Sequence, residues 1–232
     1  MKNTVYILHG WAIDTENEKK WATFRDLLKK YSIQTVFLPL PGLTTKLETA
    51  WTLDDYIAWL EKELPKGEKA ILLGHSFGGQ IAARFAAQYP EKVTRLILIA
   101  SAGMIDRAPQ KVLKRMVFGF AAKVGKPILR HEVFRKVLYK LAREQDYLNA
   151  NKTQRQTMAN VINTEIIDYL PQIECPTLLI WGKNDTATPL KFAKVFQSEI
   201  EQSQLHIITN ARHSPQFTHA IETAEVIGEF LK

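Results

Sequence analysis

The chain has 232 residues, of which 46% are hydrophobic and 24% charged, a composition typical of one globular α/β domain that excludes wholesale disorder and coiled coil. No uncharged apolar stretch approaches the roughly eighteen residues of a transmembrane helix. The net charge of +7 is concentrated between residues 107 and 143, where eleven basic residues face one acid. The lone Cys175 cannot form an internal disulfide, and residues 1–4 leave no room for a signal peptide, so we expect a cytoplasmic protein.

Six strand-like runs alternate with helical patterns along the chain. They cover residues 5–9, 33–38, 70–75, 95–100, 177–182 and 204–209. Four of them contain apolar residues without alternation, as in 96–99 and 178–180, which indicates strands covered on both faces. The pattern predicts an α/β fold with a mostly parallel sheet of about six strands and helices on both faces.

One long interval interrupts this alternation. From residue 103 to 170 there is no convincing strand, only helical patterns at 109–122, 131–147 and 153–169. Such a length is too great for a simple connection between two strands. We therefore predict a helical cap insertion at 103–170, set into a core formed by residues 1–102 and 171–232.

A candidate nucleophile follows the third strand. In the segment 74–78, with the sequence GHSFG, Ser76 stands between a strand and a helix, where a sharp turn exposes the hydroxyl. The small residues two positions to either side allow the backbone to pass without a clash. The alternative is a serine that only caps the following helix.

A serine hydroxyl needs a base, and the base needs an acid to orient it. Asp185 follows the fifth strand and His213 the sixth, which gives the order Ser76, Asp185, His213 that is expected of GxSxG enzymes on such sheets. Each has an alternative explanation, since Asp185 suits an ordinary turn and His213 could merely precede a helix capped by Ser214. Asp106, after the fourth strand, is a competing acid.

Acyl transfer also needs donors for the tetrahedral oxyanion, and two backbone N–H groups suffice. We expect one from Phe77, the residue after the nucleophile. The second should come from Trp11, because Gly10 permits the turn that aims its amide inward. Both residues are also expected to contact substrate, although Trp11 could instead be a hydrophobic plug beneath the insertion.

These motifs resemble those of the α/β-hydrolase superfamily. The similarity spans nearly the whole chain except the insertion and rests on four segments: 9–11 (HGW), 74–79 (GHSFGG), 181–185 (WGKND) and 213–215 (HSP). It is greatest to small carboxylesterases of the pimeloyl-carrier-protein methyl esterase type. The resemblance implies the roles given above for Ser76, His213, Asp185, Trp11 and Phe77, and a helical cap over the pocket.

The expected function is a serine carboxylic-ester hydrolase that acts through an acyl-enzyme on small to medium acyl esters. The alternative is a carbon–carbon bond hydrolase of a β-diketone-type substrate with the same triad. A perhydrolase is a third possibility, and from another class a non-catalytic ligand receptor. We expect no metal and no organic cofactor, because no zinc spacing, P-loop or dinucleotide fingerprint is present.

The basic part of the insertion has three explanations. Its Lys and Arg stems could cover an apolar stripe of the cap, its charge could steer an acidic acyl carrier protein to the pocket, or it could rest on an anionic membrane. The charge has no accompanying stacking platform, so nucleic-acid binding is not expected.

Overall fold

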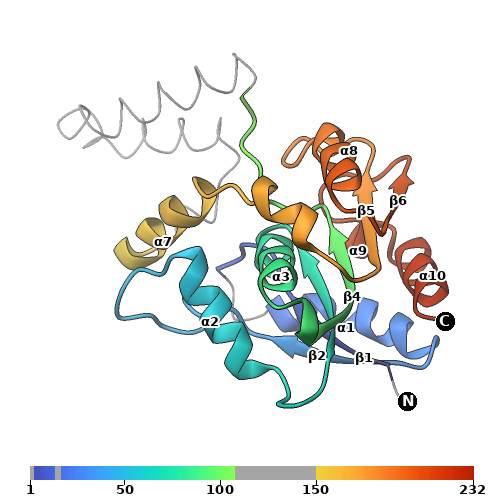
Figure 1. The fold of residues 1–232 in the computed structure, drawn as a ribbon, viewed down its shortest axis with the longest axis horizontal. Coiled ribbons are helices and arrows are strands. Elements are labelled where there is room, and N and C mark those ends of the chain that lie inside the picture. The colour runs from blue at the N-terminus through green and yellow to red at the C-terminus, as the bar shows by residue number, and fades with distance from the viewer. Residues whose placement is uncertain (1–2, 14–16, 108–149) are drawn as a thin grey trace.

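A computed structural model describes residues 3–13, 17–107 and 150–232. The elements in chain order are β1 (Asn3–Leu8), α1 (Asn17–Lys29), β2 (Ile33–Leu38), α2 (Leu53–Glu63), β3 (Ala70–His75), α3 (Phe77–Gln88), η1 (Pro90–Lys92), β4 (Val93–Ile99), α7 (Lys152–Ile162), η3 (Ile167–Gln172), β5 (Thr177–Gly182), α8 (Leu190–Glu199), β6 (Ser203–Ile208), α9 (Pro215–Thr218) and α10 (Ala220–Phe230) (Figure 1).

The six strands form one parallel sheet in the order β2-β1-β3-β4-β5-β6, which confirms the predicted fold class. From β1 the chain moves to β2 at one edge of the sheet. It then returns to β3 on the other side of β1, and each later strand is added toward the opposite edge. The order therefore reverses between β1 and β3. In open parallel sheets, ligands bind at such a switch point, beyond the carboxyl ends of the strands.

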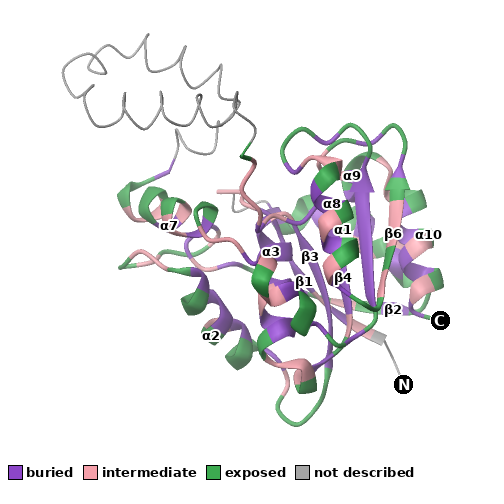
Figure 2. Ribbon diagram, turned by 45° about the horizontal axis from the view of Figure 1, so that its top comes forward, coloured by how far each residue is buried: buried purple, intermediate pink, exposed green. Residues whose placement is uncertain are grey.

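Helices cover both faces of the sheet. Right-handed crossovers place α1 on one face and α2, α3 and α8 on the other, and α10 packs beside α1. Strands β3 and β5 are buried along their whole length (Figure 2), which explains their unbroken apolar sequence. Helix α3 is buried over most of its residues because it packs between β3, β4 and η3.

All six expected strands agree with the structure to within two residues at each end. The fourth strand runs Val93–Ile99 rather than 95–100, because Ala100 adopts φ 46° and leaves the extended conformation. That turn directs the chain away from the sheet at its carboxyl edge.

The predicted helix at 153–169 was wrong as a single element. Helix α7 ends at Ile162, and a separate 3₁₀ helix, η3, begins at Ile167. The chain turns between them because the Thr164 hydroxyl bonds the Asn160 carbonyl and the Ile166 amide bonds Gly103 instead of continuing the helix. The helices expected at 109–122 and 131–147 lie outside the described residues, so the cap remains a prediction.

Candidate active site

Ser76 occupies the turn between β3 and α3 in a strained backbone conformation. Its φ of 52° and ψ of −114° are rare for a residue with a side chain, and its amide is held by the Ile99 carbonyl at 3.0 Å. The turn requires glycine two residues later, because a Cβ at Gly78 would lie 2.1 Å from the Leu8 carbonyl oxygen. The local geometry is that of a nucleophile elbow.

His213 reaches Ser76 from the loop between β6 and α9. Its Nε2 lies 2.9 Å from Ser76 Oγ, and its Nδ1 lies 2.8 Å from Asp185 Oδ2. The three residues come from the carboxyl ends of three parallel strands, and the structure brings all three sequence-predicted side chains together. The arrangement can move a proton from the hydroxyl to the imidazole, which Asp185 orients.

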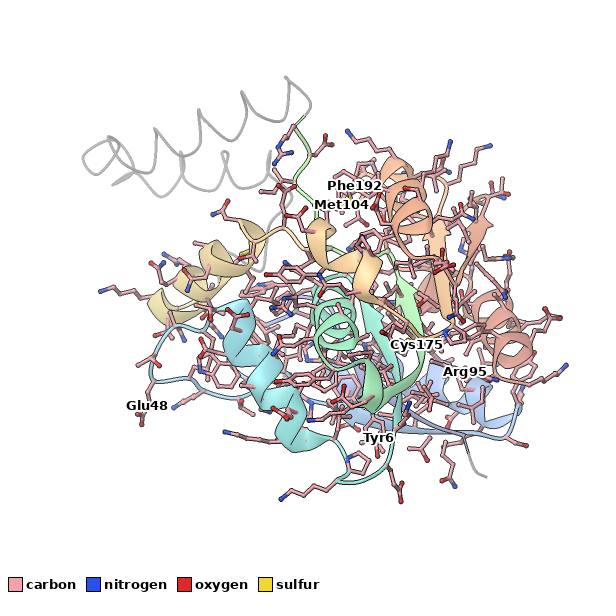
Figure 3. The ribbon with its side chains drawn as sticks, in the orientation of Figure 1. Tyr6, Glu48, Arg95, Met104, Cys175 and Phe192 are labelled. Atoms are coloured by element: carbon pink, nitrogen blue, oxygen red, sulfur yellow. The ribbon has the colours of Figure 1, made fainter. Side chains whose placement is uncertain are left out.

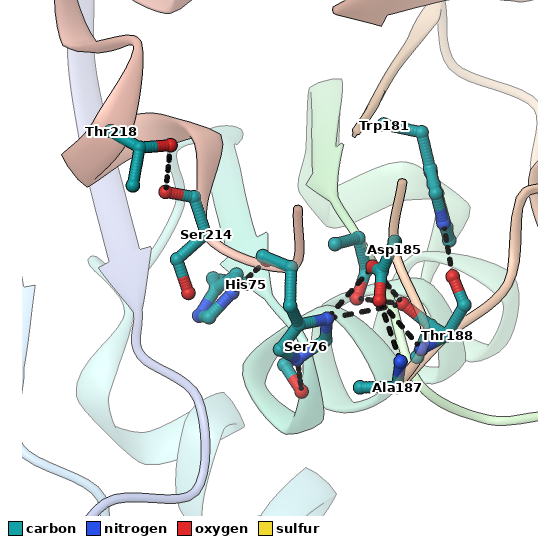
Figure 4. Close-up of polar contacts among 10 residues, drawn as sticks. His75, Ser76, Trp181, Asp185, Ala187, Thr188, Ser214 and Thr218 are labelled. Atoms are coloured by element: carbon teal, nitrogen blue, oxygen red, sulfur yellow. Dashed lines mark hydrogen bonds and ion pairs between the residues drawn. The ribbon is translucent and has the colours of Figure 1, made fainter. Parts of the chain in front are cut away.

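Hydrogen bonds from neighbouring groups hold the carboxylate of Asp185 in place (Figure 4). Its Oδ1 accepts the amides of Ala187 at 2.8 Å and Thr188 at 3.0 Å, and its Oδ2 accepts the Thr188 hydroxyl at 2.8 Å. Burial by itself raises the pKa of Asp185, but the contacts with His213 and Thr188 outweigh it, so the pKa lies below its usual value. The acid is therefore ionised when His213 must accept a proton.

Asp106, the competing acid, is placed differently. Its Oδ1 lies 2.6 Å from Lys191 Nζ at the start of α8. The acid that the structure pairs with His213 is Asp185.

His75, inside the elbow, holds the loop of His213, a contact that sequence reasoning missed. Its Nε2 lies 2.9 Å from the His213 carbonyl oxygen, so this nitrogen carries the hydrogen and donates it. Burial, together with the charge of His213, lowers the pKa of His75 to about 3, so the ring stays neutral. No sequence signal marks this role, because the position between glycine and serine is unconstrained in the GxSxG pattern.

The two residues predicted to supply the oxyanion donors, Trp11 and Phe77, line the same cavity as the nucleophile. A Cβ at Gly10 would lie 3.2 Å from Ser76 Cβ, so the loop after β1 passes directly against the serine. The Trp11 and Phe77 rings pack with centroids 5.6 Å apart. Buried His9 steadies this loop, accepting the Leu40 amide at Nε2 and donating from Nδ1 to Gly10 O, and burial lowers its pKa to about 4.

A cavity of about 260 Å³ opens over Ser76 and His213. Helix α7 supplies one wall, and Met104 and Phe192, both labelled in Figure 3, line the cavity from the segment after β4 and from α8. None of its described lining residues is Asp, Glu, Lys or Arg. Besides Ser76 and His213 they are Trp11, Phe77, Gln80, Ala102, Gly103, Met104, Met158, Val161, Ile162, Thr164, Ala187, Thr188 and Phe192. The described walls therefore suit an uncharged, mostly apolar group.

The described residues offer neither a metal site nor a membrane-spanning helix. Within residues 3–13, 17–107 and 150–232, no group of three or more His, Cys, Asp or Glu side chains is placed to hold a metal ion. The same residues contain no helix with the length and apolarity needed to cross a bilayer.

Comparison with known proteins shows the family. The family model described as alpha/beta hydrolase fold matches residues 3–220, and the chain belongs to that family. A pimeloyl-[acyl-carrier protein] methyl ester esterase of Shewanella woodyi is 27% identical, with 97% of this chain and 92% of the relative aligned. A monoacylglycerol lipase of Xenopus laevis is 25% identical over 99% of this chain and 75% of its own length.

A solved structure supports the same fold. A membrane phospholipase A described as a bacterial virulence factor superposes with a TM-score of 0.74 at 23% identity, covering 99% of this chain and 78% of that one. At this identity the match shows the fold alone, and one fold can host many different reactions.

Proposed function

We propose that the protein is a serine carboxylic-ester hydrolase. The observation that carries the proposal is the distance of 2.9 Å between Ser76 Oγ and His213 Nε2, in a histidine already oriented by Asp185. The relatives named as esterase and lipase support the same class of reaction.

The proposed reaction has two halves. His213 Nε2 takes the Ser76 proton as Oγ attacks the ester carbonyl, while the amides of Trp11 and Phe77 bind the developing oxyanion. His213 then gives that proton to the leaving alcohol, and an acyl group remains on Ser76. A water molecule attacks this acyl-enzyme with His213 again as base, which releases the acid and restores the serine.

The cavity supports an acyl or alcohol group that is small to medium and uncharged. Its volume is about 260 Å³, and none of its described lining residues is a Lys or Arg that could form an ion pair with a carboxylate. Carbon–carbon cleavage of a β-diketone-type substrate would use the same three side chains. An experiment must therefore distinguish this reaction from ester hydrolysis.

The test is hydrolysis of p-nitrophenyl esters with acyl chains from two to twelve carbons, beside a panel of β-diketones. We expect turnover of esters with a short- to medium-chain optimum, because longer chains exceed the cavity. Turnover confined to the diketones would contradict the proposal and favour the alternative.

We further propose that residues 103–170 form a cap and that its basic part steers an acidic acyl carrier protein to the site. The name of the Shewanella relative supports a carrier-bound ester, and the segment 107–143 supplies a local charge of +10. Most of that segment lies outside the described residues. The described Arg107 forms an ion pair with Glu165.

Salt dependence distinguishes electrostatic steering from the alternative that the basic side chains only form the solvent-exposed face of a helix. We expect kcat/KM for a pimeloyl-carrier methyl ester to fall steeply as the salt concentration rises, because screening shortens the reach of the field. Turnover of a neutral p-nitrophenyl ester is the control and should barely respond. Replacing Lys136 and Lys140 with glutamate should weaken the dependence, whereas salt-independent turnover of the carrier ester would contradict steering.

A further inference from the structure

Gln80 lies on α3, one turn beyond the nucleophile, and is 2% exposed. Its amide Nε2 lies 2.8 Å from the Thr164 carbonyl and 3.2 Å from the Val161 carbonyl. Both partners are acceptors only, which fixes the orientation of the amide and uses both of its hydrogens. The backbone amide of Gln80 in turn bonds the Ser76 carbonyl at 3.1 Å. One residue therefore connects the nucleophile turn to a second segment.

That second segment is the end of α7, which forms a wall of the cavity. Met158, Val161 and Ile162 line the cavity from α7, and Thr164 follows at its edge. The Val161 carbonyl, in the last turn of α7, also accepts the Thr164 amide at 3.2 Å, and the Thr164 carbonyl lies just beyond the helix. Gln80 donates to both carbonyls from α3 and so ties the end of α7 to the helix that follows the nucleophile.

The rest of α7 is held independently of Gln80. Thr157 Oγ1 accepts the Trp51 amide at 3.0 Å, and Asn160 Nδ2 donates to the Trp51 carbonyl at 3.0 Å. Near the start of the helix, Gln154 Nε2 donates to the Gly42 carbonyl at 2.8 Å. Loss of the Gln80 amide should therefore release the cavity end of α7 and leave its beginning and middle in place.

We infer that Gln80 is a specificity-determining residue that sets the length of the group the cavity admits. It acts by position, holding the wall formed by Val161 and Ile162 at a fixed distance from the helix that carries Ser76. The inference rests on the proposed function, since it concerns the group that enters beside the nucleophile. Without both donors, the part-buried Thr164 carbonyl loses its side-chain partner, and the end of α7 must shift for water to replace that partner.

The test measures how fast Ser76 reacts with methyl p-nitrophenyl alkylphosphonates whose alkyl chains run from two to twelve carbons. Ser76 Oγ forms a bond to phosphorus, p-nitrophenolate leaves, and His213 takes the proton. Released p-nitrophenolate gives the rate, and mass spectrometry locates the adduct. The variants are Gln80→Met, which has similar volume and no donors, and Gln88→Met, the same change at an exposed position of α3.

In the wild type we expect a sharp optimum of chain length. The preference is the rate with the optimal chain divided by the rate with a chain that is two carbons longer. In Gln80→Met this ratio should fall about fivefold or more, which is the factor that corresponds to the free energy of one ordinary hydrogen bond. Gln88→Met should keep the wild-type preference. A purely structural role of Gln80 would lower stability without changing the chain-length preference. Thermal melting of each variant measures that loss of stability separately.

The two ideas can fail separately. A wild-type preference in folded Gln80→Met would overturn the role of Gln80 and leave the hydrolase proposal standing. If the wild type reacts with no phosphonate at Ser76, the proposed function fails, and the inference fails with it. If Gln80→Met does not fold, Gln80→Asn serves in the same assay, because its amide is one methylene too short to reach both carbonyls.

Discussion

Replacing Ser76 with alanine should lower kcat for a p-nitrophenyl ester by about 10⁶-fold, the loss found when the nucleophile alone is removed from a serine hydrolase. The reason is that the hydroxyl 2.9 Å from His213 Nε2 is the atom that would form the acyl-enzyme. The fold should persist, since alanine places no larger side chain at this strained turn than serine does. Steady-state kinetics with a burst-phase assay measures the effect.

The matched control is Ser198→Ala. Ser198 is an exposed serine on α8 whose hydroxyl bonds only the local Val195 carbonyl among the described contacts. Its loss should leave kcat unchanged. Substantial ester turnover by purified Ser76→Ala would show that another group attacks the carbonyl, and the proposed mechanism would be wrong.

Replacing Asp185 with asparagine should lower kcat by about 10⁴-fold, as when the acid of a triad becomes an amide. The carboxylate accepts from His213 Nδ1 at 2.8 Å, whereas an amide nitrogen placed there favours the tautomer whose Nε2 carries the hydrogen and cannot accept the serine proton. The other oxygen can still accept the amides of Ala187 and Thr188, so the loop should stay in place.

The same substitution at the competing acid provides the control. Asp106→Asn removes an ion pair with Lys191 and should change kcat by less than a few fold, because the pair does not touch the reacting groups. A large loss in Asp106→Asn with near-normal activity in Asp185→Asn would reassign the acid. Circular dichroism spectra of both variants would show whether a lost fold accounts for either result.

Much of this architecture was accessible from the sequence because its signals are local. Unbroken apolar runs such as 178–180 identify buried parallel strands, and the GHSFG segment requires a strand before it and a helix after it. Since the carboxyl ends of parallel strands lie along one edge, residues that follow β3, β5 and β6 gather there. This is why Ser76, Asp185 and His213 could be named before their distances were known.

The contacts that hold the catalytic residues and the cavity wall in place could not be predicted from the sequence, because they join segments far apart in the chain. His75 bonds the His213 carbonyl across 138 residues, and Gln80 bonds the Thr164 carbonyl across 84. Neither contact leaves a periodic pattern or a motif. The end of α7 was missed for the same reason, since the Gly103 carbonyl that helps to turn the chain lies about 60 residues earlier in the sequence.

The most direct test of the central claim is to trap the acyl-enzyme itself. The protein would be mixed with p-nitrophenyl butyrate, quenched in acid within the burst phase, digested and analysed by mass spectrometry. We predict a butyryl group on the peptide that contains Ser76, absent from Ser76→Ala and accumulating in wild type as p-nitrophenolate appears. Ester turnover with the butyryl group on another residue, or with no covalent adduct at any time, would contradict the nucleophilic role of Ser76.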